Sequence, residues 1–177
     1  MENFAFNHQL LLWIYAGAHP LAWQLDLGIF AAKYLCYFFP LVLVYQGVRY
    51  RDRRALVIVI LIAIFLSIAL SQLIQHFYPT NRPFVDGLVS NLIHHAVNSS
   101  FPSDHTLFAA TIAFGFIFGR VYKLGVFLLA LTLVIGWGRV YVGVHYPLDI
   151  AGGLLIGLIS ALVCVKAFLG SFQKALL

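Results

Sequence analysis

Residues 55–75 read ALVIVILIAIFLSIALSQLIQ, a run without a single charged residue. About 20 apolar residues in a helix cross the hydrocarbon core of a bilayer, so this stretch predicts a transmembrane helix. Four further runs are apolar and long enough, or nearly long enough, to do the same: 22–47, 106–119, 124–138 and 149–169. The sequence therefore predicts an all-α, polytopic membrane bundle with five transmembrane helices.

The composition of the whole chain agrees with this class. Of the 177 residues, 62% are hydrophobic and only 10% are charged, which leaves more apolar surface than a soluble fold can bury. Disorder, a disulfide scaffold and a nucleic-acid-binding domain are therefore excluded, despite a net charge of +5. Cys36 and Cys164 lie inside apolar runs, where we expect inert packing. Close helix packing is expected at two pairs of small residues: Gly115 with Gly119, and Gly153 with Gly157.

The N-terminal segment 4–18, FAFNHQLLLWIYAGA, is apolar but short, and no basic residue precedes it. It resembles neither a signal peptide nor a complete span, and we expect an interfacial helix on the outer face. If this segment does span the membrane, the bundle has six transmembrane helices and the N-terminus moves to the cytoplasm. No linker, repeat or low-complexity tract appears, so residues 1–177 are predicted to form a single integral-membrane domain.

The distribution of the eleven Lys and Arg residues predicts the orientation. Eight of them fall on one side of the predicted spans: Arg49, Arg51, Arg53, Arg54, Arg120, Lys123, Lys166 and Lys174. The positive-inside rule makes that side cytoplasmic. The opposite side carries Arg82 and Arg139, and Lys33 lies within the first span. A lysine in mid-membrane needs a partner or a wet cleft, so Lys33 either pairs with Asp26 or contacts the substrate.

Three polar segments gather on the outer side of the predicted bundle. They are NRP at 81–83, FPSDH at 101–105 and GRVYVGVHYPLD at 138–149. In the second segment, Ser103 stands at the N-cap position of the third span, and the first amides of that helix form a ready site for an anion. Arginines, histidines and carboxylates on one membrane face thus predict a polar site for an anionic group.

The third polar segment carries a pair of residues suited to nucleophilic chemistry. His145 and Asp149 are four residues apart, and Pro147 between them suits the first turn of the fifth span. At this spacing the carboxylate can reach the imidazole and hold it in one tautomer, with the other ring nitrogen free to attack.

These segments resemble the motifs of the type 2 phosphatidic acid phosphatase superfamily of membrane lipid phosphatases. The three motifs of that family are written K-x6-R-P, P-S-G-H and S-R-x5-H-x3-D. Over residues 75–149 this chain has the corresponding series Gln75-x6-Arg82-Pro83, Pro102-Ser103-Asp104-His105 and Gly138-Arg139-x5-His145-x3-Asp149. The P-S-D-H form resembles the bacterial undecaprenyl diphosphate phosphatase branch, of the bacitracin-resistance type.

The resemblance implies a role for each matching residue. His145 would be the nucleophile that forms a phosphohistidine, Asp149 would orient it, and His105 would protonate the departing oxygen. The residues implied to bind the substrate are Arg82, Arg139, Ser103, Asp104 and Gln75. No metal or other cofactor is implied, because the arginines and the helix start supply the positive potential.

Three positions depart from the family motifs. Gln75 replaces Lys and removes one positive charge from the phosphate site, and Gly138 replaces Ser and loses a hydroxyl contact. Asp104 replaces Gly and brings a negative charge toward the site, which makes sense if it pairs with an arginine or orients His105. None of the three removes a member of the implied catalytic set.

The function implied is dephosphorylation of undecaprenyl diphosphate to undecaprenyl phosphate, which recycles the lipid carrier of the cell envelope. The enzyme would lie in the bacterial cytoplasmic membrane, with its site facing the periplasm or the extracytoplasmic side. Its partners would be the polyprenyl diphosphate substrate and membrane lipids, and no nucleic acid. The first alternative is the same chemistry on phosphatidylglycerophosphate, phosphatidate or a lipid A phosphate. The second is a carrier or transporter of phosphorylated lipids, which would not need the pair His145 and Asp149.

The remaining histidines on the outer side are interpreted as interfacial polar residues. This reading applies to His76, His94 and His95 taken singly, while the pair His94-His95 could instead help to bind pyrophosphate. Adjacent side chains on a helix or strand point apart, so the pair suits a metal poorly. A zinc or bis-histidine haem site is disfavoured because no Cys or Glu stands at metal-ligand spacing.

Overall fold

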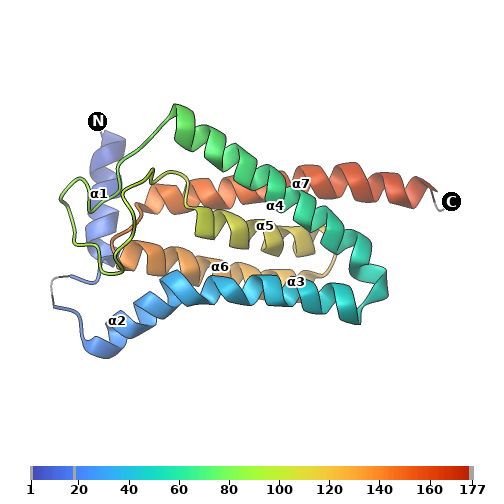
Figure 1. The fold of residues 1–177 in the computed structure, drawn as a ribbon, viewed down its shortest axis with the longest axis horizontal. Coiled ribbons are helices and arrows are strands. Elements are labelled where there is room, and N and C mark those ends of the chain that lie inside the picture. Colours follow the sequence, from blue (N-terminus) through green and yellow to red (C-terminus); the bar gives the residue numbers. More distant parts are fainter. Residues whose placement is uncertain (1, 18, 176–177) are drawn as a thin grey trace.

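A computed structural model describes residues 2–17 and 19–175. In this part of the chain the regular structure is helical, as the sequence predicts. The segments in chain order are α1 (Glu2–Ile14), α2 (Ala22–Ile29), the π-helical turn η1 (Phe30–Tyr34), the 3-10 turn η2 (Leu35–Tyr37), α3 (Phe38–Arg49), the 3-10 turn η3 (Arg51–Arg53), α4 (Arg54–Phe77), α5 (Asp104–Phe118), α6 (Tyr122–Tyr141) and α7 (Pro147–Ala175). Figure 1 shows α3, α5, α6 and α7 along the long axis of the bundle, with α4 crossing them obliquely.

Four helical stretches of the described chain are long and apolar enough to cross a membrane: Ala22–Arg49, Arg51–Phe77, Tyr122–Tyr141 and Pro147–Phe168. The third predicted span, 106–119, corresponds to α5, which has only 15 residues. Such a helix is about 22 Å long at 1.5 Å per residue, whereas the hydrocarbon core measures about 30 Å. The prediction of five full spans therefore exceeds what the structure shows.

The short helix α5 is surrounded by longer helices. It packs against α4, α6 and α7 and begins farther inside the bundle than the outer ends of α6 and α7 (Figure 1). Most of its side chains are buried, so protein rather than lipid covers the polar chain that precedes it. Irregular backbone at membrane depth is tolerated only under such cover. This cover explains why α5, although shorter than the thickness of the hydrocarbon core, can lie at the centre of the bundle.

The two predicted pairs of small residues lie at helix contacts. A Cβ atom added at Gly153 would be 2.8 Å from the carbonyl oxygen of Ser103, and one at Gly157 would be equally close to a side chain of α5. Gly115 and Gly119 in turn face side chains of α4 with no room for a Cβ. The expectation of close packing at these glycines is confirmed.

The N-terminal helix α1 lies across the end of the bundle that also carries the segment 78–103 and the α6–α7 connection (Figure 1). It contacts α6 and α7 and leaves Phe6, Leu12 and Trp13 exposed. Thirteen residues are too few to span a bilayer, and the exposed apolar side chains fit the interfacial helix that we predicted. The last residue of the predicted segment, Ala18, lies outside the described residues.

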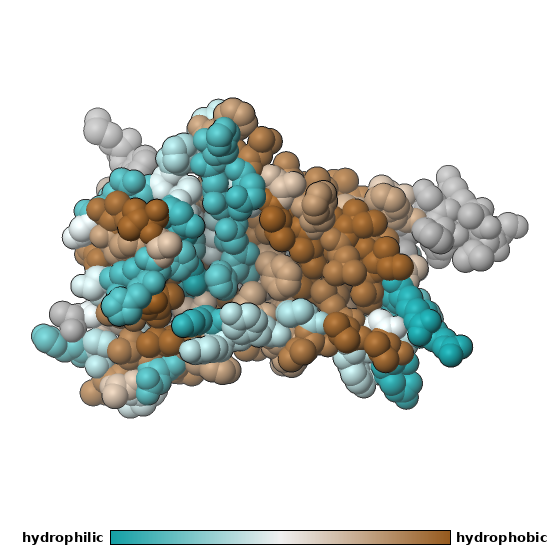
Figure 2. Space-filling view, in the orientation of Figure 1, coloured by the Kyte–Doolittle hydropathy of each residue, from teal (hydrophilic) through white to brown (hydrophobic). Residues whose placement is uncertain are grey.

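Polar and apolar residues separate along the long axis of the molecule. Figure 2 shows hydrophobic residues over the middle and hydrophilic ones toward both ends. The turn η3 and the α5–α6 connection, which carry Arg51, Arg53 and Arg120, lie at the end opposite to α1 (Figure 1). Lys33 is exposed, with its Nζ 5.5 Å from the ring centre of Tyr34, and the ion pairs of the described residues do not include the pairing with Asp26.

Candidate active site

His145 lies in the short connection between α6 and α7, and only 2% of its surface is exposed. The connection turns sharply at Gly143, whose φ of +79° lies in the left-handed region that glycine adopts without strain. Beyond the turn, the backbone N–H of Val144 donates to the carbonyl of Arg139 over 3.2 Å. The chain then enters α7 at Pro147, as predicted. These features hold the imidazole of His145 on the buried side of the α6–α7 connection.

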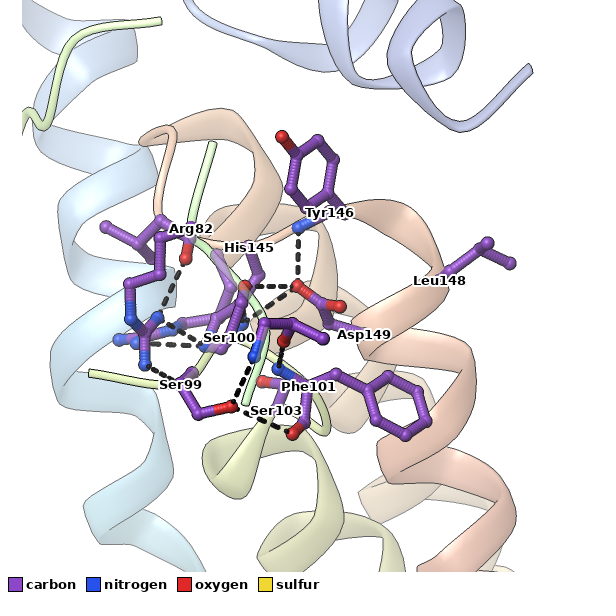
Figure 3. A network of polar contacts seen from close by, with 12 residues as sticks. Arg82, Ser99, Ser100, Phe101, Ser103, His145, Tyr146, Leu148 and Asp149 are labelled. Carbon is purple, nitrogen blue, oxygen red and sulfur yellow. Dashed lines mark hydrogen bonds and ion pairs between the residues drawn. The ribbon is translucent and has the colours of Figure 1, made fainter. Parts of the chain in front are cut away.

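One side of the His145 ring is held by a carboxylate. Its Nδ1 is 3.3 Å from Oδ2 of Asp149, which also accepts hydrogen bonds from the Ser100 hydroxyl at 2.5 Å and the Tyr146 backbone N–H at 2.8 Å. Figure 3 shows these groups around the ring. A carboxylate can only accept, so Nδ1 carries the hydrogen and Nε2 keeps its lone pair. The predicted contact of Asp149 with His145 is confirmed.

Two guanidinium groups meet at the other ring nitrogen. Nη1 of Arg82 lies 3.1 Å and Nη2 of Arg139 lies 3.4 Å from Nε2 of His145. Two cations that converge on a lone pair create a place where an anion gains electrostatic stabilisation next to a nucleophile. The structure thus brings together residues from the first and the third predicted motifs.

Arg82 uses most of its donors on the protein itself. It is 4% exposed and donates to the carbonyls of Val144 at 2.8 Å and Ser99 at 3.0 Å. Its Nε donates to the backbone and side-chain oxygens of Asn98. Arg82 therefore fixes the segment 98–100 against the connection that carries His145, and one edge of its fork remains at the ring (Figure 3).

Arg139 retains donors that the protein does not use. It is 2% exposed, and its Nη1 donates to the carbonyl of Ala32 in the π-helical turn η1 over 3.3 Å. Among the described residues, none accepts a hydrogen bond from its Nε. A buried donor without an acceptor is costly, so this edge of the guanidinium is suited to the oxygens of a ligand.

The replacement of the motif Ser by Gly138 has a packing reason. A Cβ atom here would lie 2.8 Å from both the Cβ of Ala31 and the backbone nitrogen of Ala32. The π-helical turn η1 approaches α6 so closely at this point that a serine does not fit without movement. Glycine at position 138 thus lacks the serine hydroxyl but allows η1 to pack close to α6. This close packing lets the Ala32 carbonyl accept a hydrogen bond from Arg139.

The other two departures from the motifs contact each other. Nε2 of Gln75 donates to Oδ1 of Asp104 over 3.1 Å, and the hydroxyl of Ser71 donates to the same oxygen over 2.5 Å. Among the described residues, the hydrogen bonds of Asp104 reach neither an arginine nor His105, the partners expected from the sequence, although its charge acts on Arg82 and Arg139. The extra carboxylate is instead paired with the amide that replaces the motif lysine, so the two substitutions compensate locally.

Ser103 occupies the N-cap position of α5, as predicted. Its side chain makes no capping hydrogen bond but accepts one from the Thr106 hydroxyl over 3.2 Å, while its backbone N–H donates to the carbonyl of Asp149 over 3.1 Å. The amides of the first turn lack partners within the helix. His105 lies half-buried in this first turn and interacts electrostatically with Arg139 and Arg82.

The surroundings of His145 favour its neutral form. Burial, followed by the charges of Arg139 and Arg82, lowers the pKa of His145 well below its ordinary value. The neutral imidazole is the form that can act as a nucleophile. Across residues 2–17 and 19–175 there is no group of three or more His, Cys, Asp or Glu side chains that could hold a metal ion.

Sequence reasoning missed Ser100 and left the role of His95 open. Ser100 is fully buried and donates to Asp149, but a serine before a proline-containing loop gives no signal of its own. His95 was interpreted as an interfacial residue or as part of a pyrophosphate-binding pair with His94, and its ring centre lies 6.4 Å from that of His145. Both belong to the long segment between α4 and α5, whose path no helical or strand periodicity predicts.

A cavity of about 520 Å³ opens beside Asp149 at the outer end of the bundle. Its walls come from the start of α7, the segment 80–101 and α1, which contributes Asn7 and His8. The Tyr146 hydroxyl donates to Asp86 over 2.6 Å at this wall, and His8 stacks on the Tyr146 ring. The polar network around His145 is therefore close to the surface on the side that α1 covers.

Comparisons with known proteins agree with the geometry. The sequence model of the PAP2 superfamily matches residues 55–172. YbjG of Escherichia coli (strain K12) is 41% identical over 163 residues, which cover 92% of this chain and 81% of that protein. Undecaprenyl-diphosphatase BcrC of Bacillus subtilis (strain 168) is 41% identical over 93 residues, or 52% of this chain and 48% of that protein. The crystal structure of Aquifex aeolicus LpxE has a TM-score of 0.74 and 30% identity, and the match covers 94% of this chain and 98% of that one.

Proposed function

The chain belongs to the PAP2 superfamily, and from this premise we propose that it hydrolyses undecaprenyl diphosphate to undecaprenyl phosphate and inorganic phosphate. The relatives at about 40% identity support the substrate, since BcrC of Bacillus subtilis is named an undecaprenyl-diphosphatase. The reaction recycles the lipid carrier of the cell envelope. Residues 1–177 act in it as a single integral-membrane phosphatase domain.

One observation carries the proposal: the buried imidazole of His145 is held by Asp149 at Nδ1 and faced by Arg82 and Arg139 at Nε2. A protein that merely carries an anionic lipid needs the two arginines but not an oriented nucleophile between them. The oriented tautomer thus favours an enzyme over a carrier or transporter.

In the first step, Nε2 of His145 attacks the terminal phosphorus of the substrate. An N–P bond forms, and the P–O bond to the lipid phosphate breaks. The electron pair stays on the departing bridging oxygen, which takes a proton from His105. Arg139 and the edge of Arg82 that faces the ring donate to the equatorial oxygens, where charge needs stabilisation during phosphoryl transfer.

In the second step, water hydrolyses the phosphohistidine. The water oxygen attacks phosphorus, its proton passes to His105, and the N–P bond breaks with its electron pair returning to Nε2 of His145. Inorganic phosphate is released. Asp149 holds the same ring tautomer in both steps, and the first amides of α5 after Ser103 add donors to the phosphate. The hydrogen bond between Gln75 and Asp104 supports a role for both residues in positioning that first turn against α4.

The proposed enzyme lies in the bacterial cytoplasmic membrane, with its site toward the periplasm or the extracytoplasmic side. The arginines of η3 and the α5–α6 connection, at the end opposite to α1, support this orientation through the positive-inside rule. The apolar tail of the substrate lies among the membrane helices, and its phosphates reach His145 at the outer end.

The experiment uses the purified full chain in detergent and measures phosphate release with EDTA present. We expect undecaprenyl diphosphate to be hydrolysed faster than phosphatidate. His145→Ala should abolish both turnover and acid-labile phosphate on the protein, while His76→Ala, an exposed histidine at the end of α4, should retain activity. An active His145→Ala variant would overturn the nucleophile, and a clear preference for the glycerolipid would overturn the substrate.

A further inference from the structure

His95 is held at the site by its own segment of chain. The side chain of Asn91 accepts from the His95 backbone N–H over 3.1 Å and donates to the His95 carbonyl over 2.9 Å. The backbone N–H of Leu92 donates to the Val142 carbonyl over 3.3 Å, next to the turn that carries His145. The His95 backbone is therefore tied to the catalytic connection, although it belongs to a long irregular segment.

The His95 ring has one nitrogen free for a ligand. Its Nδ1 lies 3.1 Å from the Ala96 carbonyl, which can only accept, so Nδ1 carries a hydrogen in this arrangement. None of the described residues forms a hydrogen bond with its Nε2. The ring is half-buried, and its centre lies 6.4 Å from that of His145 at an interplanar angle of 69°.

His95 shares its electrostatic neighbours with the reacting groups. The charges of Arg82 and Arg139 act on it, Asp104 acts with the opposite sign, and His105 lies within its electrostatic reach. Burial and the two arginines lower the pKa of His95, and only the Ala96 carbonyl and Asp104 oppose this. An anion that enters between these groups would favour a protonated His95, which then donates through Nε2.

Cleavage of a diphosphate calls for a hydrogen-bond donor to its leaving phosphate, a place that Nε2 of a protonated His95 can fill. When the P–O bond to the terminal phosphorus breaks, the leaving group of a monophosphate ester is an alcohol oxygen, which needs only a proton. The leaving group of a diphosphate is a second phosphate, whose additional oxygens and negative charge also need donors. His105 can supply the proton to the bridging oxygen but cannot also neutralise the phosphate behind it.

We propose that His95 binds the non-transferred phosphate of a lipid diphosphate and thereby makes the site selective for diphosphates over monophosphates. This inference rests on the proposed function, because it assigns a second phosphate subsite to the same pocket. The neighbouring His94 has no such role, since it is exposed and its backbone has a φ of 51°. Of the two adjacent histidines, His95 thus binds the phosphate and His94 lies at the surface.

The test compares binding of inorganic pyrophosphate and inorganic phosphate to the full chain in detergent by isothermal titration calorimetry. His95→Asn should weaken pyrophosphate binding about tenfold, the loss of roughly one charge-assisted hydrogen bond, while phosphate binding changes less than about twofold. His94→Asn is the matched control, because asparagine tolerates the left-handed backbone there, and it should bind both anions normally. His95→Gln, whose amide can reach the place of Nε2, should recover part of the pyrophosphate binding.

The result has a kinetic counterpart. In hydrolysis of undecaprenyl diphosphate, His95→Asn should raise KM about tenfold and leave the phosphohistidine able to form. Equal losses for phosphate and pyrophosphate, or no loss for either, would overturn the subsite. The binding measurement needs no turnover, so it stands apart from the proposed function, which fails instead if the unaltered protein releases no phosphate from undecaprenyl diphosphate.

Discussion

At the scale of single residues, the neighbours of His145 determine the pH dependence of the reaction. Burial and the charges of Arg139 and Arg82 lower the pKa of this ring below its ordinary value, which is about 6.5. Because the pKa is lowered, the ring stays neutral at pH 7 and becomes protonated only when the pH falls below the lowered value. Protonation of His145 should therefore slow phosphohistidine formation only at a pH well below 6.5, while loss of the His105 proton limits the rate on the alkaline side.

Rapid-quench measurement of phosphohistidine formation in a single turnover checks this expectation. Arg139→Gln removes one of the repelling charges, so the acidic decline should move to higher pH even though the rate itself falls. An acidic decline centred at or above pH 6.5 in the unaltered enzyme would show that burial and charge do not govern this ring.

Ser100 shows how a residue without a sequence signal contributes to the site. Its hydroxyl donates to Asp149 and lies 3.5 Å from Nδ1 of His145. Ser100→Ala leaves a buried carboxylate with one donor fewer, a loss of about 1.5–3 kcal/mol, so kcat should fall roughly 10- to 100-fold. Ser160→Ala is the control, because Ser160 is also buried but its hydroxyl has no partner among the described residues. An equal loss of kcat in both variants would contradict a specific role for Ser100.

At the scale of helices, the contact between α6 and the π-helical turn η1 places Arg139. Restoring the motif residue with Gly138→Ser puts a side chain 2.8 Å from Ala31 and Ala32. We expect a loss of about 1–3 kcal/mol in the free energy of unfolding and reduced turnover, because the carbonyl that holds Arg139 moves away. Thermal unfolding in detergent and phosphate release measure the two effects.

Gly47→Ala is the matched control for that substitution. A Cβ at Gly47 would lie 3.7 Å from Val57, an ordinary contact distance, and alanine favours the interior of a helix by about 1 kcal/mol over glycine. This variant should keep or raise the unfolding temperature. If Gly138→Ser is as stable and active as the unaltered chain, the packing account of the motif departure is wrong.

The helices themselves were largely predictable, because apolar runs of about 20 residues have few alternatives in a membrane. The predicted runs 55–75 and 124–138 lie within α4 and α6. The run 106–119 coincides closely with α5, but the structure does not show it as a full span. Hydropathy measures its apolar character and not the cover that α4, α6 and α7 give it. A helix that is buried by other helices need not match the thickness of the bilayer.

At the scale of the whole molecule, the spaced motifs predicted which residues meet, but not how their hydrogen bonds are shared. His145, Asp149, Arg82 and Arg139 converge as expected. The pairing of Gln75 with Asp104 was not predicted, because the two positions lie in different motifs and 29 residues apart in the sequence. Tertiary contacts such as this one depend on the packing of α4 against α5, which no local pattern encodes.

The proposed orientation of the molecule rests on the separation of its charges and can be tested directly. Tyr78, after α4 at the site end, and Asp52, in η3 at the opposite end, are both exposed. In a background without Cys36 and Cys164, Tyr78→Cys should react with a membrane-impermeant maleimide in spheroplasts. Asp52→Cys should react only after the membrane is opened, since the cluster of arginines around it keeps that end in the cytoplasm. The reverse labelling pattern would place the phosphatase site inside the cell and would contradict the recycling of a lipid carrier from the outer face.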